Sequence, residues 1–414
     1  MNLIARNIAY LYVIQVLRLC LPLAMLSVLT RVLTEVQYSV YLYTLASAAW
    51  LSVFVEYGFN ISATRRIAGT KDPAENRVVI VQTQSAKWML AGVSLIFVVW
   101  ALTLSSVFGP YPEWAACAWL LGAMTGITPT YYFQALSRLR IVALLEVMGG
   151  ALTFGFVLVF VRHGEDFSML AAVLVVVRFL VWQVLERRMI TDERVRYRDI
   201  FTVRPGLVAL KDGLRIFLVQ GAASLYTSFN VVLLGGVSTA YAVAVYGSCE
   251  RLVRAGLTFI GQATSAIFPW LNGLKATSPQ QLDRMRRLVL FAFFAVSVAV
   301  LPVVYFLAPL ISTLLFHDKL PDIAYVLRIM SLVIPAIAVS NVLAMHYLVV
   351  DRRERTLNIV VFSAVPINLV AGYYLSLKYG ATGMAATWVV IEWLITLSLA
   401  TIIFFRVRSP ETDR

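Results

Sequence analysis

Three arginines fall deep inside long apolar stretches of the sequence, where a charged side chain is costly. Arg18 lies in the stretch 8–30, and Arg251 and Arg254 lie at the centre of the stretch 239–267. An ionised side chain at this depth of a membrane costs at least about 2.5–3.5 kcal/mol, so it is expected to face protein or water. Guanidinium presents a planar fork of donors that matches phosphate oxygens and keeps its charge. These residues are therefore the first candidates for binding an anionic group.

Polar side chains extend this pattern along single helix faces. In the stretch 239–267 the recurring residues, three or four positions apart, are Glu250, Arg254, Thr258, Gln262 and Ser265. Such spacing places side chains on one face of a helix. Shorter runs of the same kind are Gln15 with Arg18; Ser52, Glu56 and Asn60; and Gln220, Ser224 and Thr227 with Asn230. A water-filled cleft requires such faces. Two alternatives remain open: the Ser and Thr groups only join helices by hydrogen bonds, and Glu250 simply neutralises Arg254.

Carboxylates within the apolar stretches are candidates for carrying a coupled ion. Glu56, Glu250 and Glu392 lie in three different stretches, and an ionisable group inside a membrane segment indicates a functional site by default. Glu392 could instead be a buried partner of Arg178. Lys87 is expected to reach the headgroups from a helix end through its long stem, so it is not counted with the site.

Twelve apolar stretches, each long enough to cross a bilayer, organise the chain. A bilayer core of roughly 30 Å needs about 20 apolar residues of helix. The predicted spans are 8–30, 38–60, 84–107, 113–135, 140–161, 167–186, 214–235, 239–267, 288–311, 322–349, 357–377 and 381–405. Lys and Arg are concentrated in every second gap, which places those gaps and both termini on the cytoplasmic side. The sequence thus predicts an all-α, polytopic protein of the bacterial cytoplasmic (inner) membrane.

Composition and motifs exclude several other classes of protein. Of 414 residues, 60% are hydrophobic and only 14% are charged, which does not fit a soluble globular domain. The net charge of +13 is spread over short loops, so nucleic acid is not an expected partner. The three cysteines and three histidines are too scattered for a metal site, and a phosphate-binding glycine-rich loop is absent. No cofactor is expected. The extramembrane segments are too short for a catalytic domain, so an enzyme is not expected either.

A polar stretch at 187–213 divides the chain into two halves. The prediction is an N-terminal six-helix lobe over 1–186 and a C-terminal six-helix lobe over 214–414. The stretch between them is expected to be a cytoplasmic linker, either solvated or lying in the interface as an amphipathic helix. Weak repeats pair 38–43 with 241–246 and 132–140 with 347–355. Related halves are common in secondary transporters, where the substrate site lies between them. The predicted architecture is therefore two pseudo-symmetric lobes around a central cavity.

Short motifs in the sequence resemble those of a known family. They are Tyr-Tyr-Phe-Gln at 131–134 before a basic turn, the runs 56–60 and 63–68, and the Gly-Ala-Thr-Gly run that opens at Gly380. Together with the number and orientation of the spans, they resemble the Wzx-type O-antigen and exopolysaccharide flippases of the multidrug/oligosaccharidyl-lipid/polysaccharide exporter superfamily. The resemblance implies a cationic cleft lined by the first two spans of each lobe.

With this resemblance, the residues predict a flippase that moves a polyprenyl-diphosphate-linked oligosaccharide outward by alternating access, driven by a proton or sodium gradient. The candidate substrate ligands are Arg18, Arg251, Arg254, Gln15, Gln220, Asn230 and Gln262, and the candidate ion-coupling residues are Glu56, Glu250 and Glu392. Membrane lipids and a polysaccharide polymerase are the other expected partners. The alternatives are a lipid II flippase or multidrug exporter of the same superfamily and, from another class, a membrane-embedded glycosyltransferase.

Overall fold

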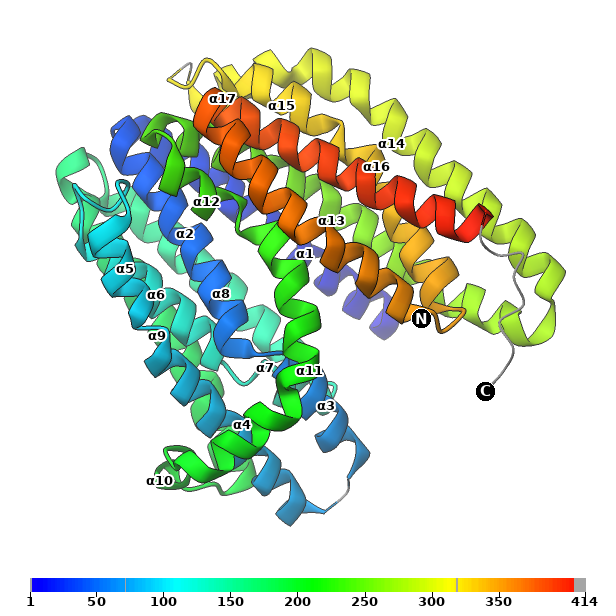
Figure 1. Cartoon of the computed structure of the whole chain (residues 1–414). Coiled ribbons are helices and arrows are strands. Elements are labelled where there is room, and N and C mark those ends of the chain that lie inside the picture. Colours follow the sequence, from blue (N-terminus) through cyan, green and yellow to red (C-terminus); the bar gives the residue numbers. More distant parts are fainter. Residues whose placement is uncertain (1, 71, 318, 406–414) are drawn as a thin grey trace. The chain divides into compact units, whose positions relative to one another are not determined.

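The regular structure of this protein is helical throughout the part that the computed structural model describes, residues 2–70, 72–317 and 319–405 (Figure 1). The segments long and apolar enough to cross a membrane are Glu35–Glu56, Pro73–Thr103, Leu139–Phe160, Gly164–Glu193, Pro279–Phe316, Ile323–Val349 and Glu354–Phe404. The other predicted spans, 8–30, 113–135, 214–235 and 239–267, also coincide with helices. The expected all-α, multi-pass membrane protein is confirmed.

The chain forms two compact units, Met1–Gly236 and Val237–Arg414. This boundary lies later in the chain than the predicted linker at 187–213. The reason is that helix α11 (Val203–Ser228) packs against α4 (Pro73–Val93) and so belongs with the N-terminal unit. The predicted linker itself contains the end of α9 (Phe167–Glu193), the short helix α10 (Tyr197–Ile200) and the start of α11.

In the described part of the N-terminal unit there are thirteen helical segments of different lengths. Besides α4, α9, α10 and α11, they are α1 (Asn2–Val32), α2 (Glu35–Glu56), α3 (Phe59–Gly69), α5 (Ile96–Leu104), α6 (Glu113–Ile127), α7 (Thr130–Ala135), α8 (Leu139–Phe160), a 3-10 turn (Gly164–Asp166) and α12 (Asn230–Val237). The start of α2 is fixed by a capping box, in which Thr34 and Gln37 satisfy each other's backbone N–H groups.

Several predicted spans are interrupted where the sequence remains apolar. The second span ends at Tyr57 and Gly58, which both adopt left-handed backbone angles (φ 53° and 78°) before α3 begins. The fourth span breaks at Thr128 and Pro129, because proline has no N–H to continue the ladder of helical hydrogen bonds. The third span breaks between Val93 and Ile96. Each interruption leaves backbone groups that other residues must satisfy.

Close contact between α2 and α6 depends on two glycines. A Cβ atom built on Gly122 would lie 2.7 Å from the Leu51 Cβ atom, and one built on Gly126 would lie 2.5 Å from the Val55 Cβ atom. Both distances are too short for any larger residue. Small residues allow membrane helices to pack closely, and α2 and α6 are in extensive contact within the N-terminal unit.

The C-terminal unit consists of longer helices: α13 (Ala240–Thr277), α14 (Pro279–Phe316), α15 (Ile323–Ser331), α16 (Val333–Val342), a π-helical segment (Leu343–Val349) and α17 (Glu354–Phe405). Within α17 the backbone of Gly380 has φ 55° and ψ −130°. This kink separates the last two predicted spans and lies at the junction of 357–377 with 381–405. The backbone approaches itself closely here, because a Cβ atom on Gly383 would meet the Leu375 carbonyl oxygen.

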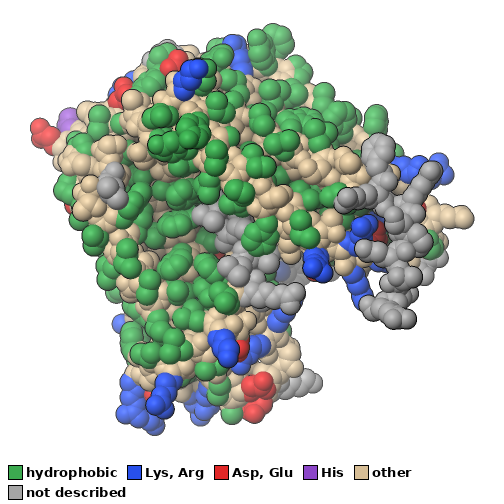
Figure 2. All heavy atoms as spheres, in the orientation of Figure 1, with side chains coloured by type: hydrophobic (Ala, Val, Ile, Leu, Met, Phe, Trp, Pro, Cys, Tyr) green, Lys and Arg blue, Asp and Glu red, His purple; other side chains and the backbone are tan. Residues whose placement is uncertain are grey.

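Apolar side chains cover most of the surface visible in Figure 2. Large exposed hydrophobic residues include Ile96, Phe291, Phe306 and Tyr374, each more than 60% exposed. Such exposure fits helices that face hydrocarbon rather than water. Lys and Arg side chains gather at the end of the N-terminal unit that carries α3 and α10 (Figures 1 and 2).

Candidate functional site

Arg18, the arginine predicted in the first span, lies on α1 and is exposed. Among the residues that the structure describes, it has no ion-pair partner. Pro22 follows it by four residues within the same helix. The side chains of two other predicted ligands, Gln15 and Gln220, lie outside the described residues.

The predicted polar stripe on α13 is present, and it contains an ion pair. The Arg254 side chain donates to Glu250 Oε1 from both Nε, at 2.9 Å, and Nη2, at 2.6 Å. Glu250 is the more buried partner, since its side chain is 9% exposed and that of Arg254 is 38% exposed. The alternative that these two residues neutralise each other along the helix is therefore confirmed. Gln262, two turns further, is exposed.

Arg251 differs from Arg254 in having no ion-pair partner among the described residues. It is half-buried on α13, next in sequence to the buried Glu250. Its guanidinium therefore keeps its full donor capacity. Of the two α13 arginines, Arg251 is the one whose charge is not already neutralised by a carboxylate of the described chain.

A tryptophan joins this ion pair to the predicted carboxylate of α17. The guanidinium carbon of Arg254 lies 5.2 Å from the centre of the Trp388 ring, a distance typical of cation–π contact. On the same residue, the indole N–H donates to Glu392 Oε1 at 3.1 Å. Glu392 is 4% exposed. The C-terminal unit thus brings Glu250, Arg254 and Glu392 together around Trp388, a residue that the sequence analysis did not single out.

The suggested pairing of Glu392 with Arg178 is wrong. Arg178 binds Glu146 on α8 instead, with 2.7 Å between Nη1 and Oε1. It also donates from Nη2 to the Thr128 hydroxyl at 3.0 Å, beside the break between α6 and α7. Arg178 and Glu146 line a mainly apolar cavity of about 430 Å³ within the N-terminal unit, together with Ser52. Sequence alone did not show which spans are neighbours, and this neighbour relation decides the pairing.

A fully buried polar cluster, missed by the sequence analysis, surrounds the same helix break. Lys87 on α4 is 0% exposed, so the expectation that it reaches the headgroups is wrong. Its ammonium donates to the Thr128 carbonyl oxygen at 3.1 Å and lies 4.8 Å from the centre of the Tyr131 ring. On the same helix Gln84 donates to Glu186 Oε2 at 2.5 Å and to the Ile127 carbonyl oxygen at 3.4 Å.

The shared feature of this cluster is that its side chains donate hydrogen bonds to backbone carbonyl oxygens at the end of α6, beside the break at Pro129. The carbonyl oxygens of Ile127 and Thr128 accept hydrogen bonds from Gln84 and Lys87, respectively, and Glu56 and Glu186 supply negative charge near Lys87. A spacing of three residues between Gln84 and Lys87, on one face of α4, was the available sequence signal.

Of the remaining predicted residues, Glu56 acts on the Lys87 cluster through its charge alone. Glu56, half-buried at the end of α2, accepts a weak hydrogen bond of 3.4 Å from the Asn60 backbone N–H. Asn230 is fully buried at the start of α12. Both belong to the N-terminal unit, as does Arg18, whereas Arg251, Arg254, Gln262, Glu250 and Glu392 belong to the C-terminal unit.

Comparison with known proteins identifies the family of this chain. Residues 4–275 match the family described as polysaccharide biosynthesis protein. The chain belongs to this family. It is a Wzx-type member of the multidrug/oligosaccharidyl-lipid/polysaccharide exporter superfamily, as its motifs indicate.

Two relatives match this polysaccharide biosynthesis protein over nearly its whole length. A candidate O-antigen transporter of Shigella dysenteriae is 24% identical over 400 residues, which are 95% of this chain and 98% of that protein. A candidate O-antigen transporter of Escherichia coli K12 is 23% identical over 401 residues, which are 94% of each chain.

Two solved structures share the fold of this family member. The structure of a lipid II flippase, MurJ, in an inward closed conformation matches with a TM-score of 0.75 at 12% identity. The match covers 96% of this chain and 86% of that one. An inward-facing multidrug transporter of the MATE family has a TM-score of 0.65 at 16% identity, with coverage of 94% of this chain and 96% of that one. These likenesses establish the fold of the polysaccharide biosynthesis protein.

Proposed function

We propose that this polysaccharide biosynthesis protein is a flippase that moves a polyprenyl-diphosphate-linked oligosaccharide from the cytoplasmic to the outer face of the membrane by alternating access. The observation that carries the proposal is the family match, joined by two full-length relatives named as candidate O-antigen transporters. The fold shared with a lipid II flippase and a MATE transporter supports a transport mechanism.

The diphosphate of the substrate calls for cationic groups inside the membrane, and the chain supplies them. Arg18 and Arg251 have no carboxylate partner among the described residues, so their donors can be directed at phosphate oxygens. Charge-assisted hydrogen bonds from guanidinium to phosphate are among the stronger polar contacts in proteins. Arg254, held by Glu250, stabilises the helix face that carries Arg251 and would bind substrate only by exchanging that partner.

Transport is proposed to be coupled to a proton or sodium gradient through a membrane carboxylate. Glu392 fits this role best of the three candidates, because it is buried and receives one hydrogen bond from Trp388, which in turn lies beneath Arg254. Binding of a proton or sodium ion would neutralise the Glu392 carboxylate. This change in charge beside Trp388 would alter the electrostatic environment of Arg254 and its partner Glu250. Glu56, half-buried at a helix end, is the candidate in the N-terminal unit.

The proposal also includes an orientation and partners. Both termini are placed in the cytoplasm by the distribution of Lys and Arg between the loops. A polysaccharide polymerase would receive the sugar at the outer face, and membrane lipids would surround the helices. Lipid II and cationic drugs are the rival cargoes. The names of the full-length relatives favour an O-antigen-type lipid-linked sugar over both.

Incubation of the purified, vesicle-reconstituted protein with a labelled polyprenyl-diphosphate-linked oligosaccharide tests the proposal. We expect the labelled lipid to become accessible to a membrane-impermeant glycosidase on the far side while its chemical structure stays unchanged. Formation of a new glycosidic bond would instead indicate a membrane-embedded transferase. Equal accessibility in protein-free vesicles and in vesicles with protein would rule out the flippase.

A further inference from the structure

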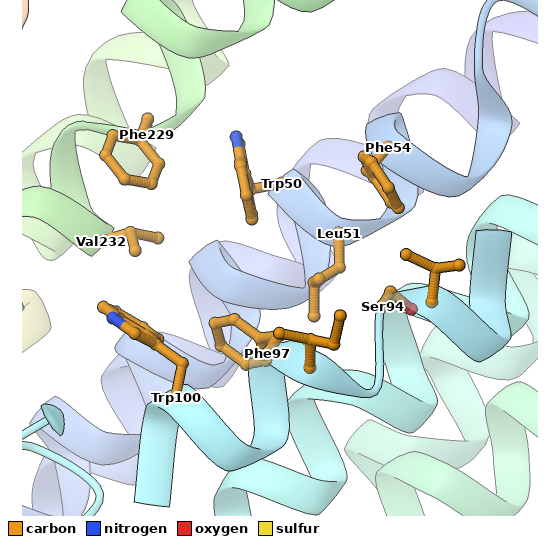
Figure 3. Close-up of a pocket in the computed structure, with 10 residues that line it drawn as sticks. Trp50, Leu51, Phe54, Ser94, Phe97, Trp100, Phe229 and Val232 are labelled. Carbon is orange, nitrogen blue, oxygen red and sulfur yellow. The ribbon is translucent and has the colours of Figure 1, made fainter. Parts of the chain in front are cut away.

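An apolar pocket of about 500 Å³ lies within the N-terminal unit, and no charged residue lines it (Figure 3). Its walls are mainly aromatic. Trp50 and Phe229 form one pair, with ring centroids 5.3 Å apart, and Phe97 and Trp100 form another, 5.6 Å apart. Figure 3 shows these two pairs on opposite sides of the pocket, with Phe54 at one end. Its volume falls within the usual range of ligand sites, about 300–1,000 Å³.

Two helix interruptions hold this pocket open. The break between α4 and α5 places Ser94 on its wall, and the break between α11 and α12 places Phe229 there. At the first break the Trp119 indole N–H donates to the Ser94 hydroxyl at 3.0 Å and to the Ala91 carbonyl oxygen at 3.2 Å. Because the Ser94 hydroxyl and the Ala91 carbonyl oxygen are already hydrogen-bonded, this break leaves the pocket wall mainly apolar.

The mouth of the pocket faces the hydrocarbon region. Val93 and Ile96 line it and are 53% and 69% exposed. They belong to the membrane-spanning segment Pro73–Thr103, whose exposed side continues along α5 with Val99, 64% exposed. A side chain exposed on such a segment meets lipid rather than water. The pocket is therefore open to a hydrocarbon chain that approaches it laterally from the bilayer.

We propose that this pocket binds part of the isoprenoid chain of the carrier lipid. The inference rests on the proposed function, which supplies the one lipid that the protein must hold while its headgroup crosses. Isoprenoid chains consist of planar, methyl-substituted alkene units, and opposed aromatic faces offer matching flat contacts. The walls carry no charge, so a headgroup is excluded and only the chain fits. Anchoring of the chain in the N-terminal unit keeps the lipid associated while the sugar is transferred.

Photolabelling of the full-length protein in lipid nanodiscs tests this pocket. The probe is a polyprenyl monophosphate with a diazirine on its isoprenoid chain, and the comparison lipid is a phosphatidylethanolamine with the same diazirine on an acyl chain. We expect the isoprenoid probe to label peptides that contain Trp50, Trp100 or Phe229, and unlabelled polyprenyl monophosphate to compete. Each isoprene unit that contacts the pocket is expected to increase the affinity for the probe about tenfold, from the usual binding free energy per non-hydrogen atom.

A matched pair of variants locates the binding. Ile96→Trp fills the mouth and is expected to lower pocket labelling about tenfold, whereas Val99→Trp, equally lipid-facing on the same helix but outside the pocket, is expected to leave it unchanged. Equal labelling by the two lipids would mean a general acyl-chain recess and overturn the assignment. Absence of pocket labelling, or full labelling of Ile96→Trp, would overturn it as well.

The same preparation separates failure of this inference from failure of the proposed function. If the pocket is labelled but the oligosaccharide does not change sides, the isoprenoid site stands and the flippase proposal fails. If the oligosaccharide changes sides and the pocket is not labelled, the flippase proposal stands and the isoprenoid site fails. Competition in the wild-type protein decides the matter even if a variant does not fold.

Discussion

Replacement of Arg251 by alanine is expected to lower the transport rate by about tenfold to hundredfold without lowering the amount of folded protein. Hydrogen bonds to a charged group contribute about 1.5–3 kcal/mol, and about 1.4 kcal/mol corresponds to a factor of ten. Arg251 is half-buried and has no ion-pair partner among the described residues, so its removal leaves no carboxylate unpaired. The measurement is the sidedness assay in vesicles, with the protein amount determined by size-exclusion chromatography.

Two further variants, one at the same position and one a helical turn away, serve as controls for Arg251→Ala. Arg251→Lys keeps the charge but not the planar fork, and is expected to retain an intermediate rate. Arg254→Ala leaves the buried Glu250 without its cation, so it should also lower stability, by up to about 3 kcal/mol because Arg254 is partly exposed. A wild-type transport rate in Arg251→Ala would remove this residue from the substrate site.

Replacement of Lys87 by methionine is expected to destabilise the protein strongly. Lys87 is completely buried, donates to the Thr128 carbonyl oxygen at the helix break and is the cation on which the charges of Glu56 and the buried Glu186 act. Loss of one partner of a buried charge pair typically costs about 3–5 kcal/mol. Thermal unfolding in detergent should therefore show a large decrease in the midpoint, whereas Lys211→Met, at an exposed position of α11, should shift it little.

A second substitution distinguishes the electrostatic effect from simple loss of packing. Glu186→Gln added to Lys87→Met removes one of the two carboxylate charges that act at this position and keeps the acceptor for Gln84, so part of the lost stability should return. If the double variant is as unstable as the sum of the two single variants, Lys87 and Glu186 do not interact. If Lys87→Met unfolds at the wild-type temperature, the buried cluster has no structural role.

The sequence predicted the positions of the membrane helices well because hydrophobic length is a local property. Helices coincide with all twelve predicted spans, and the kink at Gly380 lies between the last two. The pair of Glu250 and Arg254 was also foreseeable, since residues four apart on a helix are neighbours whatever else surrounds them.

The contacts that could not be predicted are those between helices distant in the sequence. Lys87 lies near a helix end in the sequence, but packing of α4 against α6 and α11 buries it completely. Arg178 forms an ion pair with Glu146 rather than with Glu392, and Glu392 accepts a hydrogen bond from Trp388. Helix interruptions such as the one at Tyr57 and Gly58 were not predicted. The sequence stays apolar through them, and hydropathy carries no information about backbone angles.

The central claim is that guanidinium groups inside the membrane recognise the diphosphate of a lipid-linked sugar. Native mass spectrometry of the full-length protein with polyprenyl diphosphate, and with the uncharged polyprenyl alcohol as reference, tests it most directly. We predict that Arg18→Ala and Arg251→Ala each weaken binding of the diphosphate lipid about tenfold and leave binding of the alcohol unchanged. Equal binding of the diphosphate lipid by the wild type and both variants would contradict the claim.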